Sequence, residues 1–214
     1  MHRLRIRFGR GAGVKFISHL DIIKLWRRAL RRADIELAYS EGFNPHPKIS
    51  VAAPLALGVT SKAELMDVYT AGFISPHSFT TCVSRQLPPG MEIIQVYNIA
   101  TILPSLQAQV RYAEYIVEVE VGKGADYITE ALTSLLAREG LPWQHQRDTG
   151  PRSYDLRVLI DDLWLAGWRD DYGTIGMRLR CDSRGSGRPE QVAKALGFER
   201  PESVHRTRLI LETS

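Results

Sequence analysis

The segment Tyr39–Lys48, with the sequence YSEGFNPHPK, gathers the side chains best suited to chemistry. Gly42 permits backbone conformations that other residues resist. Pro45 and Pro47 fix their own φ and push the residues before them toward extended conformations. Such restraint lowers the entropy lost when side chains hold a ligand. We predict a stiff binding loop, the alternative being a rigid crossover whose polar groups only satisfy buried backbone. Its candidate binding residues are Phe43, Asn44, His46 and Lys48.

Two histidines are candidates for acid–base chemistry, since imidazole titrates near neutral pH. His46 lies in the segment above, and His19 begins a predicted helix after a Ser18 cap, with Asp21 three residues further on. At that position an imidazole can contact an anion together with the free N–H groups of the first turn. Metal-independent RNA cleavage by His19 and His46 is therefore one hypothesis, although their spacing does not demand it. The alternative for His19 is an ordinary surface or cap histidine.

The predicted helix 19–33 has one apolar and one basic face. At 100° per residue the apolar face holds Ile22, Ile23, Leu25, Trp26, Ala29, Leu30 and Ala33. The opposite face holds Lys24, Arg27, Arg28, Arg31 and Arg32. Four of these five cations are arginine, which favours planar recognition of phosphate or carboxylate. They are candidate phosphate contacts, and a merely solvated face is the alternative.

Positive charge is concentrated in the first quarter of the chain. Residues 1–48 hold 11 of the 28 Lys and Arg but four of the 24 Asp and Glu, so they carry +7 while the whole 214-residue chain carries +4. This asymmetry favours a polyanion or an acidic partner surface.

The second half offers weaker candidates for anion binding. Arg157 ends the segment YDLR, and Arg184 and Arg188 lie in RCDSRGSGR, a Gly-Ser-Arg loop before Pro189 and a predicted helix. Backbone N–H groups there can meet an anion, but the strict phosphate-loop pattern is absent. A plain flexible turn is the alternative.

Several classes of protein are disfavoured by composition. Cys82 and Cys181 form no CxxC pair, which excludes a zinc ribbon and a locally bound four-iron cluster, so we expect no metal and no cofactor in this chain. No stretch approaches the roughly 18 apolar residues of a membrane span, and the basic N-terminus lacks the apolar core of a signal peptide. We therefore expect a soluble cytoplasmic protein with no membrane partner.

Periodicity predicts an α+β fold of two tandem ferredoxin-like βαββαβ units with antiparallel sheets. The first unit spans 1–105 and contains the basic helix and the GFNPHPK loop; the second spans 106–214. Besides helix 19–33 we predict helices at 76–87, 125–138 and 189–196. Strands are predicted at 3–8, 35–39, 48–54, 63–71, 92–99, 113–121, 143–148, 155–161, 173–181 and 206–212. Strand 3–8 should be half-buried, because Leu4, Ile6 and Phe8 alternate with arginines.

Three segments resemble the radical-SAM-linked domain of unknown function. They are FISHLDIIKLWRRALRRA (16–33), YSEGFNPHPKIS (39–50) and APLALGVTSKAE (53–64), and the later pieces DLRVLI, RPEQVAKAL and RTRL also match its pattern. The resemblance implies a free-standing partner of a radical SAM protein, because this chain has no CxxxCxxC of its own. The partner enzyme is then expected to carry the iron–sulfur cluster and S-adenosylmethionine.

Residues and resemblance together favour an accessory binding protein with no independent catalytic activity, which presents RNA or a ribonucleoprotein to a radical SAM enzyme. The first rival is the RNA-cleaving or RNA-modifying enzyme using His19 and His46. The second is a protein-interaction scaffold whose basic helix docks on an acidic surface.

Overall fold

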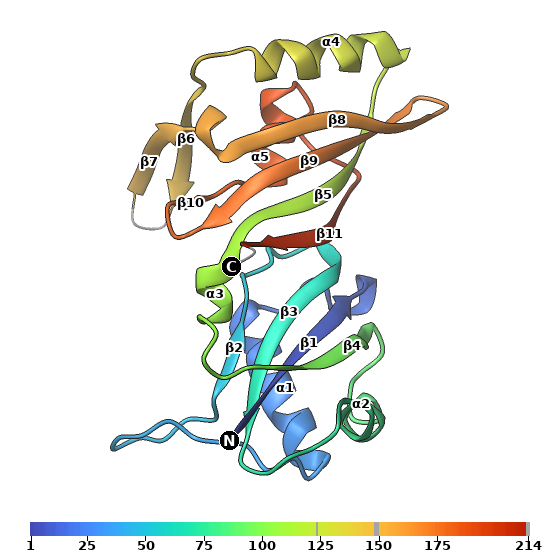
Figure 1. The fold of residues 1–214 in the computed structure, drawn as a ribbon. Helices are drawn as coiled ribbons and strands as arrows, with labels where there is room; N and C mark the ends of the chain where they lie inside the picture. The colour runs from blue at the N-terminus through green and yellow to red at the C-terminus, as the bar shows by residue number, and fades with distance from the viewer. Residues whose placement is uncertain (123, 148–149, 213–214) are drawn as a thin grey trace. The chain divides into compact units, whose positions relative to one another are not determined.

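The computed structural model describes residues 1–122, 124–147 and 150–212, which form two compact units (Figure 1). Unit 1 comprises Met1–Val110 and the end of the chain from Leu211, and unit 2 comprises Arg111–Ile210. The fold is mixed α+β, with mostly antiparallel strands and five α-helices in the described residues.

Unit 1 is a four-stranded antiparallel sheet with strand order β2-β3-β1-β4. Its strands are β1 (His2–Arg10), β2 (Ile49–Val51), β3 (Thr60–Thr70) and β4 (Met91–Ile99). Its helices are α1 (His19–Arg32), α2 (Pro76–Ser84) and the short α3 (Leu106–Gln109), with a 3-10 turn at Ala12–Val14.

The core of unit 1 lies between one face of this sheet and helices α1 and α2. Leu4, Ile6 and Phe8 of β1 are fully buried there, as the alternation predicted. Phe8 packs edge-on against Trp26 of α1, with ring centroids 5.0 Å apart. Burial of large aromatic side chains of this kind supplies much of the hydrophobic stabilisation of a small domain. The core thus fixes which face of α1 points outward.

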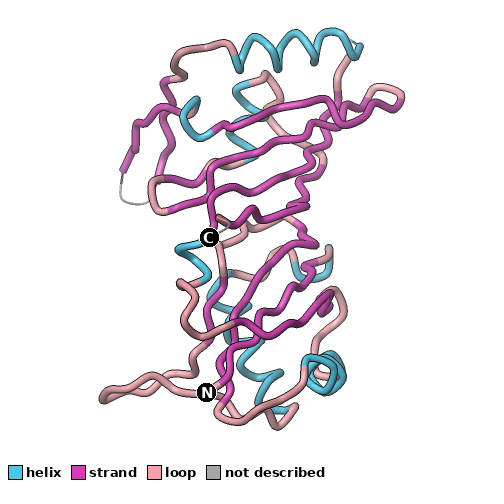
Figure 2. The backbone as a smooth tube through the Cα atoms, in the orientation of Figure 1, coloured by secondary structure: helices cyan, strands magenta, loops and turns pink. Residues whose placement is uncertain are grey.

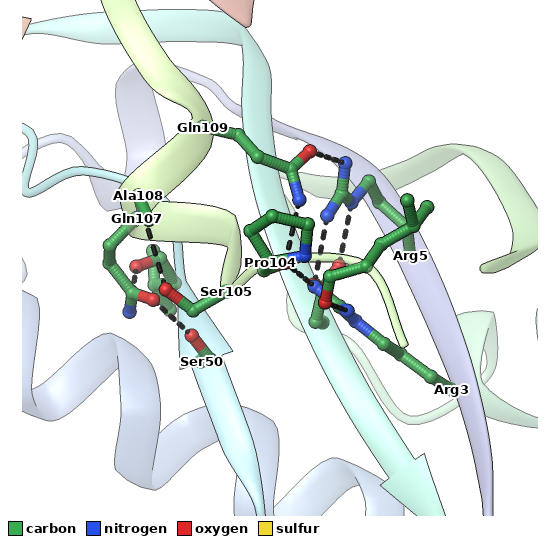
Figure 3. Close-up of polar contacts among 11 residues, drawn as sticks. Arg3, Arg5, Ser50, Pro104, Ser105, Gln107, Ala108 and Gln109 are labelled. Carbon is green, nitrogen blue, oxygen red and sulfur yellow. Dashed lines mark hydrogen bonds and ion pairs between the residues drawn. The ribbon is translucent and has the colours of Figure 1, made fainter. Parts of the chain in front are cut away.

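The opposite face of β1 is buried as well, so the prediction of a half-buried strand was wrong. Arg3 and Arg5 are 2% and 3% exposed, and both donate to the carboxylate of Asp67 on β3. The segment around α3 covers this face: Arg3 donates to the carbonyls of Leu103 and Pro104, and Arg5 to the side chain of Gln109 (Figure 3). Buried arginines are tolerated because each charge is paired and hydrogen-bonded.

Unit 2 is an antiparallel sheet with order β11-β5-β9-β8, covered by two helices. The strands are β5 (Val110–Glu120), β8 (Ile160–Arg169), β9 (Tyr172–Asp182) and β11 (Ser203–Leu211), and the two-residue β10 (Gly185–Ser186) pairs with β9. The helices are α4 (Gly124–Leu136) and α5 (Pro189–Ala195). A separate hairpin of β6 (Pro142–Arg147) and β7 (Gly150–Asp155) precedes a 3-10 turn at Arg157–Leu159.

Two strand predictions were wrong for local reasons. The segment 35–39 makes only two isolated bridges, Leu37 with Thr70 and Tyr39 with Pro47. The predicted strand 155–161 is instead the end of β7, the 3-10 turn and the first residues of β8. Register shifts at Ile160/Asp162 and at Leu165/Gly167 interrupt the alternation of β8. The sequence of β8 therefore lacks the regular period of two from which strands were predicted.

Candidate functional site

The beginning of helix α1 is held by a reciprocal cap. The Ser18 hydroxyl accepts from the Asp21 N–H at 3.2 Å and donates to the Asp21 carboxylate at 2.7 Å. Lys24 forms an exposed ion pair with Asp21 at 3.0 Å. The hydrogen bond from Ser18, and then the contact with Lys24, lower the pKa of Asp21 below its ordinary value of 3.8. The predicted cap is confirmed, and the Asp21 carboxylate is bound to the neighbouring Ser18 and Lys24 side chains.

Helix α1 presents its cations outward as the pattern predicted. Ile22, Trp26, Ala29 and Leu30 are buried. Lys24, Arg28, Arg31 and Arg32 are exposed, and Arg27 is half-buried.

The chain leaves α1 through a left-handed residue. Asp34 has φ +55°, and the Ile35 N–H returns to the Leu30 carbonyl at 3.1 Å, which is the geometry of a Schellman C-terminus. The reversal carries residues 35–37 back along the helix toward Thr70 of β3. The last turn of α1 therefore faces the segment that follows it.

Residues 39–47, which we call the arm, form a narrow loop that projects from unit 1 and returns beside itself (Figures 1 and 2). Its base is hydrogen-bonded across: Ser40 N–H to the His46 carbonyl at 2.8 Å, His46 N–H to the Ser40 hydroxyl at 2.9 Å, and Lys48 N–H to the Ala38 carbonyl at 2.8 Å. Gly42, with φ +117°, allows the reversal at the tip. Phe43 beside it is completely exposed.

A hollow of about 560 Å³ lies between the outer face of α1 and the base of the arm. We call it the α1 hollow. The helix contributes cations, the segment after the helix contributes two carboxylates and two apolar side chains, and the arm contributes an aromatic ring and a proline. Its lining residues are Lys24, Arg27, Arg28, Arg31, Asp34, Ile35, Glu36, Leu37, Tyr39 and Pro47.

The cations of the α1 hollow outnumber its carboxylates four to two. Among the described residues, Arg27, Arg28 and Arg31 have no ion-pair partner. The Nε of Arg27 is shielded from solvent and has no hydrogen-bond partner in the described part of the chain. The excess of cations over carboxylates in the lining favours an anionic group in the hollow.

The predicted site residues are only partly brought together. Four of the five basic helix residues line the α1 hollow, and the loop contributes Pro47 and Tyr39 rather than its predicted binding residues. Phe43, Asn44 and His46 are exposed on the arm and Lys48 is half-buried at its base. Ser18 and His19 lie at the opposite end of α1, a 14-residue helix about 20 Å long. The hollow contains neither histidine.

A second hollow of about 640 Å³ lies between α1 and the chain after α2. Its polar lining includes Asp21, Arg32 and Arg85. Lys24 and Arg28 line both hollows, whereas Arg31 lines only the first and Arg32 only the second.

The candidate residues of unit 2 have local structural partners. Arg157 donates to the carbonyls of Leu136 and Ile160, which ties α4 to the start of β8. The backbone N–H groups of Arg184 and Gly185 both donate to the Asp182 carboxylate. These N–H groups therefore stabilise a local turn. Arg188 contacts His145 at 3.4 Å.

Sequence reasoning missed Tyr39, Asp34 and Glu36 as lining residues. Tyr39 opens the YSEGFNPHPK segment, so an aromatic at the base of a stiff loop was the available signal. Asp34 and Glu36 follow the last basic pair of the helix, and only the left-handed turn at Asp34 places them beside it.

No three His, Cys, Asp or Glu side chains within residues 1–122, 124–147 and 150–212 gather as a metal site. None of the helices in the part of the chain that the structure describes has the length and apolar character needed to cross a membrane.

The solved structures similar to this chain include two that are 9% identical to it. A crystal structure of a Cbf5–Nop10–Gar1 complex matches 96% of this chain and 48% of that chain, with a TM-score of 0.51. The archaeal box H/ACA sRNP Nop10–Cbf5 complex matches 97% and 48%, with a TM-score of 0.47. The chain thus spans about half the length of these proteins, and the likeness to the first concerns the fold alone.

No curated protein matches the chain. A family profile described as an uncharacterized protein conserved in bacteria, DUF2344, matches residues 3–189. Because this match covers most of the 214 residues, the chain belongs to the DUF2344 family of uncharacterized bacterial proteins.

Proposed function

We propose that this protein is an accessory RNA-binding protein that holds RNA at the outer face of helix α1. The observation that carries the proposal is the α1 hollow, in which three arginines without ion-pair partners among the described residues line one space with Tyr39. Unpaired guanidinium groups favour phosphate, because their planar donors match its oxygens. If the basic face of α1 were merely solvated, the arm residues Tyr39 and Pro47 would not be needed beside it.

The matched pair Arg31→Ala and Arg32→Ala tests this function. The two variants remove the same charge from adjacent exposed positions, but only Arg31 lines the α1 hollow. Fluorescence anisotropy with transfer RNA and with mixed single-stranded RNA should show weaker binding for Arg31→Ala than for Arg32→Ala. Affinity for wild-type protein should fall steeply as salt rises. Absence of RNA binding, or binding that salt does not change, would contradict the proposal.

We further propose a radical SAM enzyme as the partner, which would supply the cluster and S-adenosylmethionine. Support comes from the sequence resemblance in residues 16–33, 39–50 and 53–64. The test is co-purification of the tagged chain with a radical SAM protein of the same genome after nuclease treatment. Loss of the complex on nuclease treatment would indicate that RNA bridges the two proteins, and no complex at all would contradict the partnership.

We also infer that each unit is a ferredoxin-like βαββαβ variant. The strand orders β2-β3-β1-β4 and β8-β9-β5-β11 support this interpretation, because in both units the first and third strands are central and the second and fourth are outer. In unit 2 the hairpin of β6 and β7 is then an insertion between the first helix and the second strand.

A further inference from the structure

We propose that the α1 hollow takes one unpaired nucleotide of a single-stranded RNA, with its base stacked on Tyr39 and its phosphate held by Arg28 and Arg31. This inference rests on the proposed function and narrows its substrate from RNA in general to an unpaired strand. It assigns a recognition role to Tyr39 and to the two carboxylates of the hollow.

The lining of the α1 hollow divides into two chemically different walls. The helix wall presents the cations, and the opposite wall presents Tyr39 and Pro47 with Ile35 and Leu37. A phosphate group alone would bind to the cations of the helix wall, and the aromatic and apolar side chains of the opposite wall would add no affinity for it. A nucleotide uses both walls, because its phosphate is anionic and its base has an apolar π face.

Tyr39 is exposed on a braced part of the chain. The residue is 54% exposed, although its backbone is tied to Pro47 across the base of the arm. The ring is therefore positioned on a braced backbone while much of its surface is open. A duplex keeps its bases stacked inside the helix, so an open ring of this kind is useful only toward a base that is unpaired.

Asp34 and Glu36 give the hollow an acidic component beside its cations. Two carboxylates in the same hollow repel phosphate, which disfavours a chain of phosphates running through it. They accept hydrogen bonds from the N–H groups that every nucleobase carries on its pairing edge and from the ribose 2′-hydroxyl. The carboxylates thus match the base and sugar, and the arginines match the phosphate. The volume of about 560 Å³ is within the range of small-ligand pockets, which suits a single nucleotide.

The test is a binding comparison with three probes: a short labelled single-stranded RNA, the same sequence as a duplex, and inorganic tripolyphosphate as a competitor. The variants are Tyr39→Ala, Tyr39→Phe and Arg31→Ala. We expect Tyr39→Ala to weaken single-stranded RNA binding about tenfold, the loss of one stacked base, and Tyr39→Phe to leave it nearly unchanged. Competition by tripolyphosphate should be insensitive to Tyr39→Ala and weakened by Arg31→Ala.

The two proposals fail in different ways. If Arg31→Ala weakens RNA binding and Tyr39→Ala does not, or if duplex binds as tightly as single strand, the nucleotide assignment is overturned while the RNA-binding function stands. If no probe binds, the RNA-binding function itself is overturned. If Arg31→Ala and Arg32→Ala behave alike, the α1 hollow is not the RNA site, and the nucleotide assignment is overturned with it. Circular dichroism and the thermal midpoint of each variant establish that it is folded, and the exposed Tyr39 ring makes Tyr39→Phe a mild change.

Discussion

Arg31 and Arg32 are adjacent in the last turn of α1, yet they line different hollows: Arg31 faces the arm and Arg32 faces the chain after α2. The helix turns about 100° per residue, so consecutive side chains point in different directions. Removing either arginine therefore lowers the net charge by the same amount but changes a different hollow. A comparison of the two variants shows whether the position of the charge matters for binding.

The salt dependence of RNA binding provides the first prediction. Arg31→Ala should reduce the slope of log affinity against log salt by about one, because each neutralised phosphate releases about one counterion. Arg32→Ala should change the slope less, since its side chain lies outside the α1 hollow. The measurement is fluorescence anisotropy across a salt series, and equal slopes for the two variants would place the RNA elsewhere.

The buried ion pairs of β1 provide the second prediction. Asp67 accepts from Arg3 at 2.6 Å and from Arg5 at 2.7 Å, and its side chain is 1% exposed. Asp67→Asn leaves two buried guanidinium groups without a counter-charge, which should lower the free energy of unfolding by about 3–5 kcal/mol. Urea denaturation measures this loss.

Asp21→Asn is the matched control for that loss. It also removes a carboxylate paired with a cation, but Asp21 and its partner Lys24 are both exposed. Exposed pairs contribute little, because water screens them. A similar fall in stability for Asp21→Asn and Asp67→Asn would show that burial of the Asp67 network is not what matters.

How far the sequence predicts this molecule is seen by comparing α1 with β1. The amphipathic period and the Ser18 cap located α1 to within a residue, because both signals are local. The same logic failed for Arg3 and Arg5, which alternate like solvent-facing residues and are buried. Their partner Asp67 is more than 60 residues away in the chain, and the covering segment near Leu103 is further still. Local periodicity contains no information on such pairing.

The candidate site shows the same division. The cations of the α1 hollow were predicted, since a helical period places them on one face. Tyr39 and Glu36 were not, because their position depends on the reversal at Asp34 and on the hydrogen-bonded base of the arm. The hypothesis that His19 and His46 act together stays a prediction, since His19 begins α1 and His46 lies on the arm, and neither lines the α1 hollow.

The left-handed residue at the end of α1 provides the third prediction. Asp34 has φ +55°, where glycine has no steric penalty, and its negative charge lies at the helix C-terminus, where the dipole disfavours it. Asp34→Gly should therefore raise the free energy of unfolding by about 0.5 kcal/mol. Thermal denaturation measures the change. Glu36→Gly, which also removes a carboxylate but at a residue without positive φ, should lower stability, and the opposite order would refute the backbone argument.

The cap of α1 provides a pH-dependent prediction. The Ser18 hydroxyl is the main cause of the lowered pKa of Asp21, so Ser18→Ala should move that pKa back toward 3.8. Because the pKa is lower in the folded state, the stabilisation by the Asp21 carboxylate is complete above the unfolded value. It is lost as pH falls through the folded pKa. The thermal midpoints of wild type and Asp21→Asn should therefore converge in acid and differ at neutral pH. NMR titration of the Asp21 carboxyl checks the direction, and an unchanged value in Ser18→Ala would show that the cations Lys24 and Arg28 hold the pKa down without the hydroxyl.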